Sequence, residues 1–185
     1  MLATGYLMAT KTTMSTIQAR IPNRGVKEIF KQKFSDWFRE SLSAFNVQEL
    51  YAMMESGNTE RVEEILNDRF FCSINYHDTL EEFYHGVALA LMRCNSDYIC
   101  TSSQENERFV IQCKQRRRWK LAFVLGFKVS DQEKQMIKDA REAIAQIKGY
   151  VSDLQEEGYE KIMTYGIAFC EKRCKVAKGE TYSLS

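Results

Sequence analysis

Residues 98–129 read YICTSSQENERFVIQCKQRRRWKLAFVLGFKV, and the fold class can be inferred from them. It contains three short runs rich in isoleucine, valine and phenylalanine, at 98–101, 108–114 and 120–129, separated by polar residues. Branched and aromatic side chains favour extended backbone. We therefore expect three successive β-strands joined by turns.

The segments on either side of these strands have the spacing of helices. Asp78 is followed three positions later by Glu81 and then by an apolar stretch to about residue 93, which is the pattern of a capped helix. After the third strand, Ser130 and Asp131 are expected to cap a long amphipathic helix over about 132–156. Two more strands are expected at 162–170 and 174–177. The order helix, three strands, helix, two strands predicts an α/β fold with a mixed sheet.

A small all-helical segment is expected before this core, at 25–74. Apolar residues recur at helical spacing over 26–42, and two further helices are expected at 47–54 and 60–70. The stretch Ser56-Gly57-Asn58-Thr59 should end the first of these two and cap the second. The chain is thus predicted to have three parts: 1–24, 25–74 and 75–185.

The composition excludes several classes of protein. The chain of 185 residues has 26 basic and 25 acidic residues, so no global charge attracts it to nucleic acid or to an anionic membrane. The six cysteines do not form the framework of a small secreted domain, and we expect reduced thiols. The N-terminal run over 1–14 is too short and too polar for a signal peptide or a spanning helix. We therefore expect a cytoplasmic protein without a membrane partner.

Seven short stretches resemble, in order, a family of bacterial proteins in which a PD-(D/E)XK nuclease domain follows an AAA-ATPase-like domain. The resemblance implies a restriction-endonuclease-like core within 75–185 and makes 1–24 a remnant of the ATPase-like region. No GxxxxGK[ST] loop occurs in the sequence, so nucleotide binding is not expected. The stretches are Thr4-Gly5-Tyr6-Leu7, Ile21-Pro22-Asn23-Arg24, Asp78 with Glu81, Phe83-Tyr84-His85-Gly86, Phe127-Lys128-Val129, Ala145-Gln146-Ile147 and Tyr165-Gly166-Ile167-Ala168-Phe169.

A PD-(D/E)XK site holds Mg²⁺ or Mn²⁺ with acids from two strands and uses a lysine to orient or activate water. The second acid and the lysine are two residues apart because side chains alternate along a strand. The resemblance puts Lys128 at the lysine position, Gly126 at the second acid and Val110 at the first. Neither Gly126 nor Val110 has a ligand atom in its side chain. Cleavage is therefore not expected, and neither is a metal cofactor, unless other acids replace these two as metal ligands.

The resemblance adds two residues to this vestigial catalytic site, Glu81 and Gln146. Glu81 shares a helix face with His85 and could line a pocket, or it could complete a capping box while His85 packs beside the sheet. Gln146 is better explained as an ordinary exposed glutamine. The nearest substitutes for the missing acids are Glu105 and Glu107, in an expected loop, and an active enzyme would use Glu81 and Glu107 as metal ligands.

One concentrated basic stretch lies at an expected hairpin tip. It could bind phosphates while its tryptophan stacks on a base, although charged hairpin tips are more often simply solvated. A pair of cysteines, Cys170 and Cys174, lacks the further ligands of a zinc site, and we interpret both as buried strand residues. The basic stretch consists of Lys114, Arg116, Arg117, Arg118, Trp119 and Lys120 with one glutamine.

Three functions remain open from the sequence. The leading hypothesis is a nuclease-fold module that does not cleave and that binds DNA or RNA through the basic hairpin or a protein partner through the aromatic N-terminal helices. The alternative is an active metal-dependent nuclease with displaced acidic ligands. The third is a truncated fragment without a selected function.

Overall fold

A computed structural model describes residues 8–11, 17–20, 46–70, 81–105, 108–116 and 120–183. The chain divides into two compact units, residues 1–44 and 45–185. In the first unit, strands β1 (Met8–Lys11) and β2 (Ile17–Arg20) form an antiparallel pair with Met8 opposite Arg20. The sequence pattern did not predict this pair. The helix expected over 26–42 lies outside the described residues.

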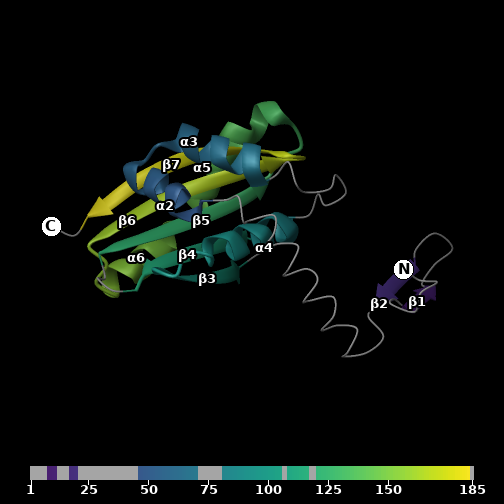
Figure 1. Cartoon of the computed structure of the whole chain (residues 1–185), viewed down its shortest axis with the longest axis horizontal. Helices are drawn as coiled ribbons and strands as arrows, with labels where there is room; N and C mark the ends of the chain where they lie inside the picture. The colour runs from purple at the N-terminus through teal and green to yellow at the C-terminus, as the bar shows by residue number, and fades with distance from the viewer. Residues whose placement is uncertain are drawn as a thin grey trace. The chain divides into compact units, whose positions relative to one another are not determined.

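A five-stranded mixed sheet forms the centre of the second unit (Figure 1). Neighbouring strands of the sheet are antiparallel, except for the third and fourth strands in spatial order. These two run parallel, and a helical crossover connects them. The predicted order of elements along the chain and the mixed sheet are confirmed, and the last strand is longer than expected. In spatial order the strands are β3 (Tyr98–Glu105), β4 (Arg108–Gln115), β5 (Leu121–Val129), β6 (Lys161–Cys170) and β7 (Arg173–Ser183).

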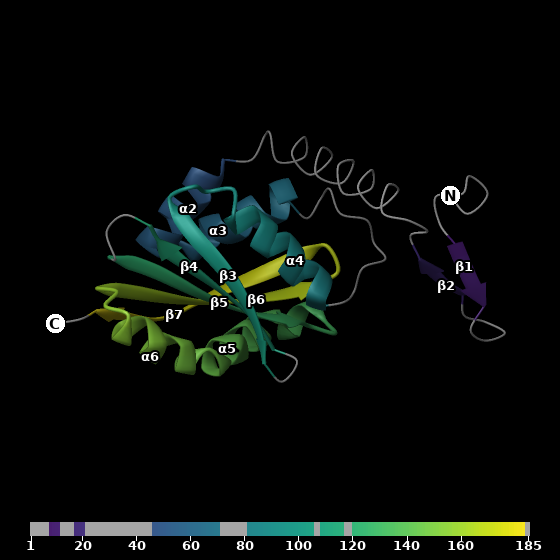
Figure 2. The ribbon, with the colours of Figure 1, turned by 90° about the horizontal axis from the view of Figure 1, so that it is seen from below.

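Helices cover both faces of the sheet (Figure 2). One layer contains α2 (Val47–Ser56), α3 (Thr59–Ile65) and α4 (Glu81–Met92), and the other contains α5 (Met136–Gln146) and α6 (Lys148–Glu156). Strand β5 is enclosed by both layers, which explains its nearly continuous apolar sequence. Its Phe123 and Phe127 contact the rings of Tyr51 and His85 in the first layer. Because side chains alternate, the even-numbered residues of β5 face α5 and α6.

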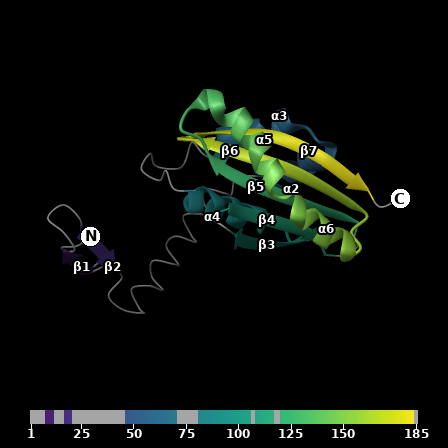
Figure 3. The ribbon, with the colours of Figure 1, turned by 180° about the vertical axis from the view of Figure 1, so that it is seen from behind.

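The crossover from β5 to β6 contains two helices where a single one was predicted over 132–156 (Figure 3). A 3₁₀ turn at Glu133–Gln135 precedes α5, and Ile147 separates α5 from α6. The side chain of Ile147 is buried, so the break directs an apolar residue toward the sheet. The predicted cap by Ser130 and Asp131 is wrong. No side chain caps the 3₁₀ turn, and the Ser130 hydroxyl donates instead to Asp139 on α5.

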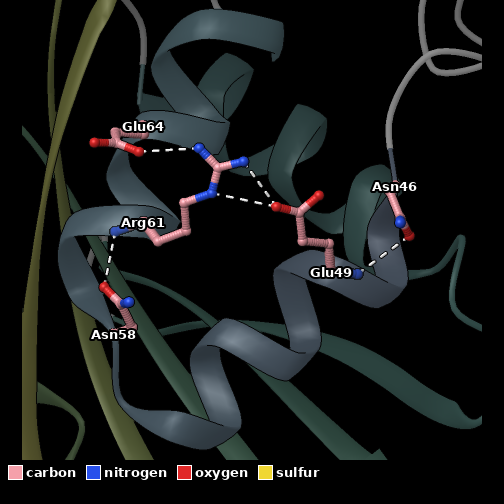
Figure 4. Close-up of polar contacts among 5 residues, drawn as sticks. All are labelled: Asn46, Glu49, Asn58, Arg61 and Glu64. Atoms are coloured by element: carbon pink, nitrogen blue, oxygen red, sulfur yellow. Dashed lines mark hydrogen bonds and ion pairs between the residues drawn. The ribbon is translucent and has the colours of Figure 1, made fainter.

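Two asparagines begin the helices α2 and α3 (Figure 4). The side chain of Asn46 accepts a hydrogen bond from the backbone N–H of Glu49, and Asn58 accepts one from that of Arg61. Gly57 ends α2 with a positive φ of 78°, a conformation that glycine adopts without strain. The predicted helix stop and the following cap are confirmed. The Arg61 guanidinium also donates to the Glu49 carboxylate at 2.8 Å, which links the two helices.

Aromatic side chains hold the first helix layer on the sheet. Tyr51 of α2 stacks on Tyr98 of β3 with 4.3 Å between ring centroids. The hydroxyl of Tyr165, on β6, donates to the backbone oxygen of Met54 in α2, and burial raises the pKa of this tyrosine to about 12. The apolar sides of these short helices are thus directed to the sheet. Among the described residues, no helix combines the length and the apolar character that crossing a bilayer requires.

Candidate functional site

Four adjacent strands place one residue each in a row across the sheet. The register pairs Ser103 with Val110, Val110 with Gly126, and Gly126 with Gly166. Val110 and Gly126 are the two positions at which the resemblance implies metal-binding acids, so β4 and β5 bring these positions side by side. None of the four side chains in the row carries a carboxylate.

Helix α5 lies directly on Gly126. A Cβ atom at this position would be 2.7 Å from the carbonyl oxygen of Ala143 and 2.9 Å from Cγ2 of Ile147. The first of these atoms belongs to the helix backbone, which cannot turn away as a side chain can. A Cβ on Gly166 would collide in the same way with the carbonyl oxygen of Ala140. Helix backbone therefore fills the space in which a glutamate side chain would begin.

Val110 belongs to an apolar cluster between the sheet and the second helix layer. Its side chain is only 2% exposed. A carboxylate at this position would lose its hydration among mostly aliphatic side chains, at a high cost in free energy. The other buried members of the cluster are Ala122, Val124, Ile147, Val151, Leu154, Tyr159 and Ile162.

Lys128, at the end of β5, is paired with two carboxylates of α5. Its Nζ donates to Oε2 of Glu142 at 2.5 Å and lies 3.9 Å from Oδ1 of Asp139. Asp139 in turn accepts a hydrogen bond from the Ser130 hydroxyl at 2.6 Å. The hydrogen bond and the positive charge of Lys128 lower the pKa of Glu142. The lysine thus fastens α5 to the end of β5.

The ion pair between Lys128 and Glu142 should make stability depend on pH. Because the pKa of Glu142 is lower in the folded chain than in the unfolded chain, its contribution is present above the unfolded value and is lost as the pH falls from about 5 through the lowered pKa. We expect Glu142→Gln to melt at a lower temperature than the wild type near neutral pH. The difference should shrink as the pH falls below the ordinary pKa of a glutamate and disappear once the pH lies below the lowered pKa of Glu142, in thermal melts followed by circular dichroism.

The control for this experiment is Lys138→Gln. The Lys138 ammonium lies on the same helix, 3.6 Å from the Glu142 carboxylate, so this substitution keeps the shorter pair with Lys128. It should lower the melting temperature less than Glu142→Gln does. A deficit of Glu142→Gln that is unchanged at low pH would show that the pair with Lys128 is not its source.

The other residues predicted for this site occupy different places. Glu81 begins α4, on the face of the sheet opposite to Lys128, and the position of its carboxylate lies outside what the structure describes. Glu105 is the last residue of β3 and not a loop residue, while Glu107 lies outside the described residues. Gln146 is the half-buried last residue of α5.

His85 packs beside the sheet on the face opposite to Lys128. Its ring lies 4.7 Å from that of Phe109, and its Nε2 is 3.2 Å from the hydroxyl oxygen of Ser102. Burial lowers the pKa of His85, and a hydrogen bond with the backbone of Val110 opposes this effect. The imidazole is therefore uncharged near neutral pH.

The basic stretch runs from the end of β4 to the start of β5, and acids pair with both of its ends. The ammonium of Lys114 lies 2.7 Å from both carboxylate oxygens of Glu157, and that of Lys120 lies 3.8 Å from Glu160. Arg116 is exposed, and residues 117–119 lie outside the described part of the chain. The charge available for a partner is thus smaller than the sequence suggests.

A cavity of about 430 Å³ lies beside the turn between β6 and β7. Its charged lining residues include two ion pairs, Arg173 with Glu133 at 3.3 Å and Lys175 with Glu63. None of the residues predicted for the nuclease site or the basic stretch lines it.

The two cysteines at the same turn are buried, as predicted. Cys170 ends β6 with 7% exposure, and Cys174 lies in β7 with 1% exposure. Burial raises the pKa of the Cys174 thiol well above its ordinary value. Across the described ranges, no three histidine, cysteine, aspartate or glutamate side chains are grouped so that they could hold a metal ion.

Sequence reasoning missed the two partners of Lys128. Asp139 and Glu142 are three residues apart on an amphipathic helix, which is also the pattern of a solvated charged face. The close approach of α5 did leave one signal in the sequence. A glycine inside a buried strand, such as Gly126, often marks a site where another backbone comes near.

A family model described as the PD-(D/E)XK nuclease superfamily matches residues 79–179. The match covers more than half of the chain, from α4 into β7, and includes the row of residues across the sheet. No curated protein matches the chain.

Proposed function

Because the chain belongs to the PD-(D/E)XK nuclease superfamily, we propose that it retains the nuclease fold without cleaving phosphodiester bonds and acts as a binding module. One observation carries this proposal. The carbonyl oxygen of Ala143 lies 2.7 Å from the point at which a Cβ of residue 126 would begin, so α5 takes the space of the second acid.

Val110 and Lys128 support the same conclusion. Cleavage in this superfamily needs a dication held by carboxylates, and magnesium and manganese prefer oxygen ligands in open, regular geometry. Val110 supplies only methyl groups, and the Lys128 ammonium is occupied by Glu142. These residues do not suit Mg²⁺ or Mn²⁺, and the lysine is fixed in a structural role.

The test of lost cleavage uses labelled double-stranded DNA, single-stranded DNA and RNA, each incubated with the purified chain in Mg²⁺ and in Mn²⁺. We expect no cleavage above the buffer background. Lys128→Ala and Lys138→Ala should behave as the wild type does. Cleavage that Lys128→Ala abolishes and Lys138→Ala keeps would overturn the proposal, whereas a contaminating nuclease would act equally in all three preparations.

For the binding role, we propose nucleic acid at the hairpin between β4 and β5. Since Lys114 and Lys120 are paired with acids, the interaction should depend on Arg116 and its neighbours at 117–119. We expect weak binding in fluorescence anisotropy that falls steeply with salt, and a further loss of about fivefold or more in Arg116→Glu.

The control for this binding experiment is Lys172→Glu, which makes the same change of charge at the turn between β6 and β7. Lys172→Glu should bind nearly as the wild type does. An equal loss of affinity in both variants would show that nucleic acid binds elsewhere on the chain. If neither DNA nor RNA binds, the binding role is left to a protein partner.

A second candidate function is metal-dependent cleavage with displaced acids. It is favoured by the two carboxylates of Asp139 and Glu142 beside Lys128, which differ from Glu81 and Glu107 suggested by the sequence. This candidate requires Lys128 to release Glu142 when an ion binds. It predicts Mn²⁺-dependent cleavage that Asp139→Asn and Glu142→Gln each abolish, and activity retained in both variants would eliminate it.

A further inference from the structure

Two cysteines face each other across the antiparallel pair β3 and β4. Cys100 and Cys113 are direct register partners, and their sulfur atoms lie 2.7 Å apart. Directly opposed residues of antiparallel strands have Cα atoms about 4.5–5.5 Å apart, which falls within the range that a disulfide bridges. The backbone therefore needs little movement to join the two sulfurs.

The surroundings make the two thiols different. Cys113 is fully buried and burial raises the pKa of its thiol, whereas the hydrogen bond with Cys113 lowers the pKa of Cys100 against the opposing effect of burial. The Tyr51 hydroxyl lies 3.2 Å from the Cys100 sulfur and contributes in the same direction, as do the charges of Arg93 and Arg116. Cys100 is thus the member of the pair that forms a thiolate.

Access to this pair is through the edge of the sheet. Strand β3 is the outermost strand of the sheet next to β4, and Ile99 beside Cys100 is 46% exposed. Edge strands open locally at a lower cost in free energy than central strands, because fewer contacts hold them. Such opening lets a small oxidant reach the sulfur of Cys100, a residue that is only 5% exposed in the closed sheet.

We propose that Cys100 and Cys113 are an oxidation site that forms a reversible disulfide with hydrogen peroxide as the oxidant. The Cys100 thiolate attacks one peroxide oxygen, the O–O bond breaks, and the leaving hydroxide takes a proton to become water. The resulting sulfenic acid is attacked by the Cys113 sulfur, whose proton leaves with the displaced hydroxide as a second water. The two sulfurs lose two electrons in total and the peroxide gains them.

The first test is peptide mapping of the wild-type chain after treatment with peroxide, unfolding and alkylation with N-ethylmaleimide. We expect a loss of two hydrogens in mass, a linked peptide containing Cys100 and Cys113, and alkylation of the other four of the six cysteines. Dithiothreitol should restore both thiols. The linked form should melt on the order of 5 °C higher, because the bond restricts the unfolded chain.

Variants provide the controls for this experiment. Cys100→Ser and Cys113→Ser should each lack the linked peptide, whereas Cys94→Ser, which removes an exposed thiol nearby in sequence, should retain it. The proposal is overturned if Cys100 and Cys113 remain alkylated under conditions that oxidise Cys94. It is also overturned if either one links to a different cysteine or proceeds only to sulfinic acid. Because the wild-type map is decisive by itself, the test does not depend on whether the variants fold.

Discussion

Gly126→Glu should destabilise the fold by about 3 kcal/mol or more and should not produce a nuclease. The new Cβ would lie 2.7 Å from the Ala143 carbonyl oxygen, so α5 would have to move away from the sheet. The carboxylate would also be enclosed between β5 and α5, away from water. Urea denaturation gives the free energy of unfolding, and the same preparation is assayed for cleavage in Mn²⁺.

Gly149→Glu is the matched control for this substitution. It makes the same replacement in the neighbouring helix α6, at an exposed position where a Cβ would meet nothing within 4 Å. It should change stability by less than about 1 kcal/mol, in the stabilising direction because glycine is a poor helix former. If Gly126→Glu is as stable as Gly149→Glu and cleaves DNA or RNA, α5 does not close the site.

Val110→Asp should lower the free energy of unfolding by about 3 kcal/mol or more, because it buries a charge and not because of a steric collision. Val110 is 2% exposed within an apolar cluster, so the introduced carboxylate is desolvated and its pKa is raised. The folded variant then binds a proton more readily than the unfolded chain does. Its deficit relative to the wild type should therefore shrink as the pH falls, and urea denaturation near neutral pH and near pH 4 would measure this.

Ile99→Asp serves as the control for burial. It introduces the same carboxylate on the neighbouring strand β3, at a side chain that is 46% exposed. Its effect should be below about 1 kcal/mol and nearly independent of pH. Equal losses in Ile99→Asp and Val110→Asp would mean that Val110 is not enclosed as described.

Much of the fold was predictable because the sequence patterns that indicate its strands and helix ends are local. The apolar runs within 98–129 indicated three strands, and Gly57 followed by Asn58 indicated where one helix ends and the next begins. The break at Ile147 was not predicted, because the apolar spacing of the helix continues through this residue, which is buried in the cluster on the sheet. Gly149, two residues after the break, is a weak mark of it in the sequence, because a single glycine is tolerated within a helix.

Part of the candidate site was also predictable, because it depends on which residues occupy given positions in the sequence. The absence of ligand atoms at Val110 and Gly126 is visible in the sequence, and the register places the two residues opposite each other. What fills the space above Gly126, and what pairs with Lys128, depends on how α5 lies on the sheet. Neither contact has a fixed spacing in the sequence, so only the folded chain shows them.

Isothermal titration of the wild-type chain with Mn²⁺ tests most directly whether these residues can hold a dication. We predict no saturable heat of binding, because Val110 and Gly126 offer no ligand and Glu142 is committed to Lys128. Saturable binding of a single ion that Asp139→Asn or Glu142→Gln weakens by about tenfold or more would contradict this account.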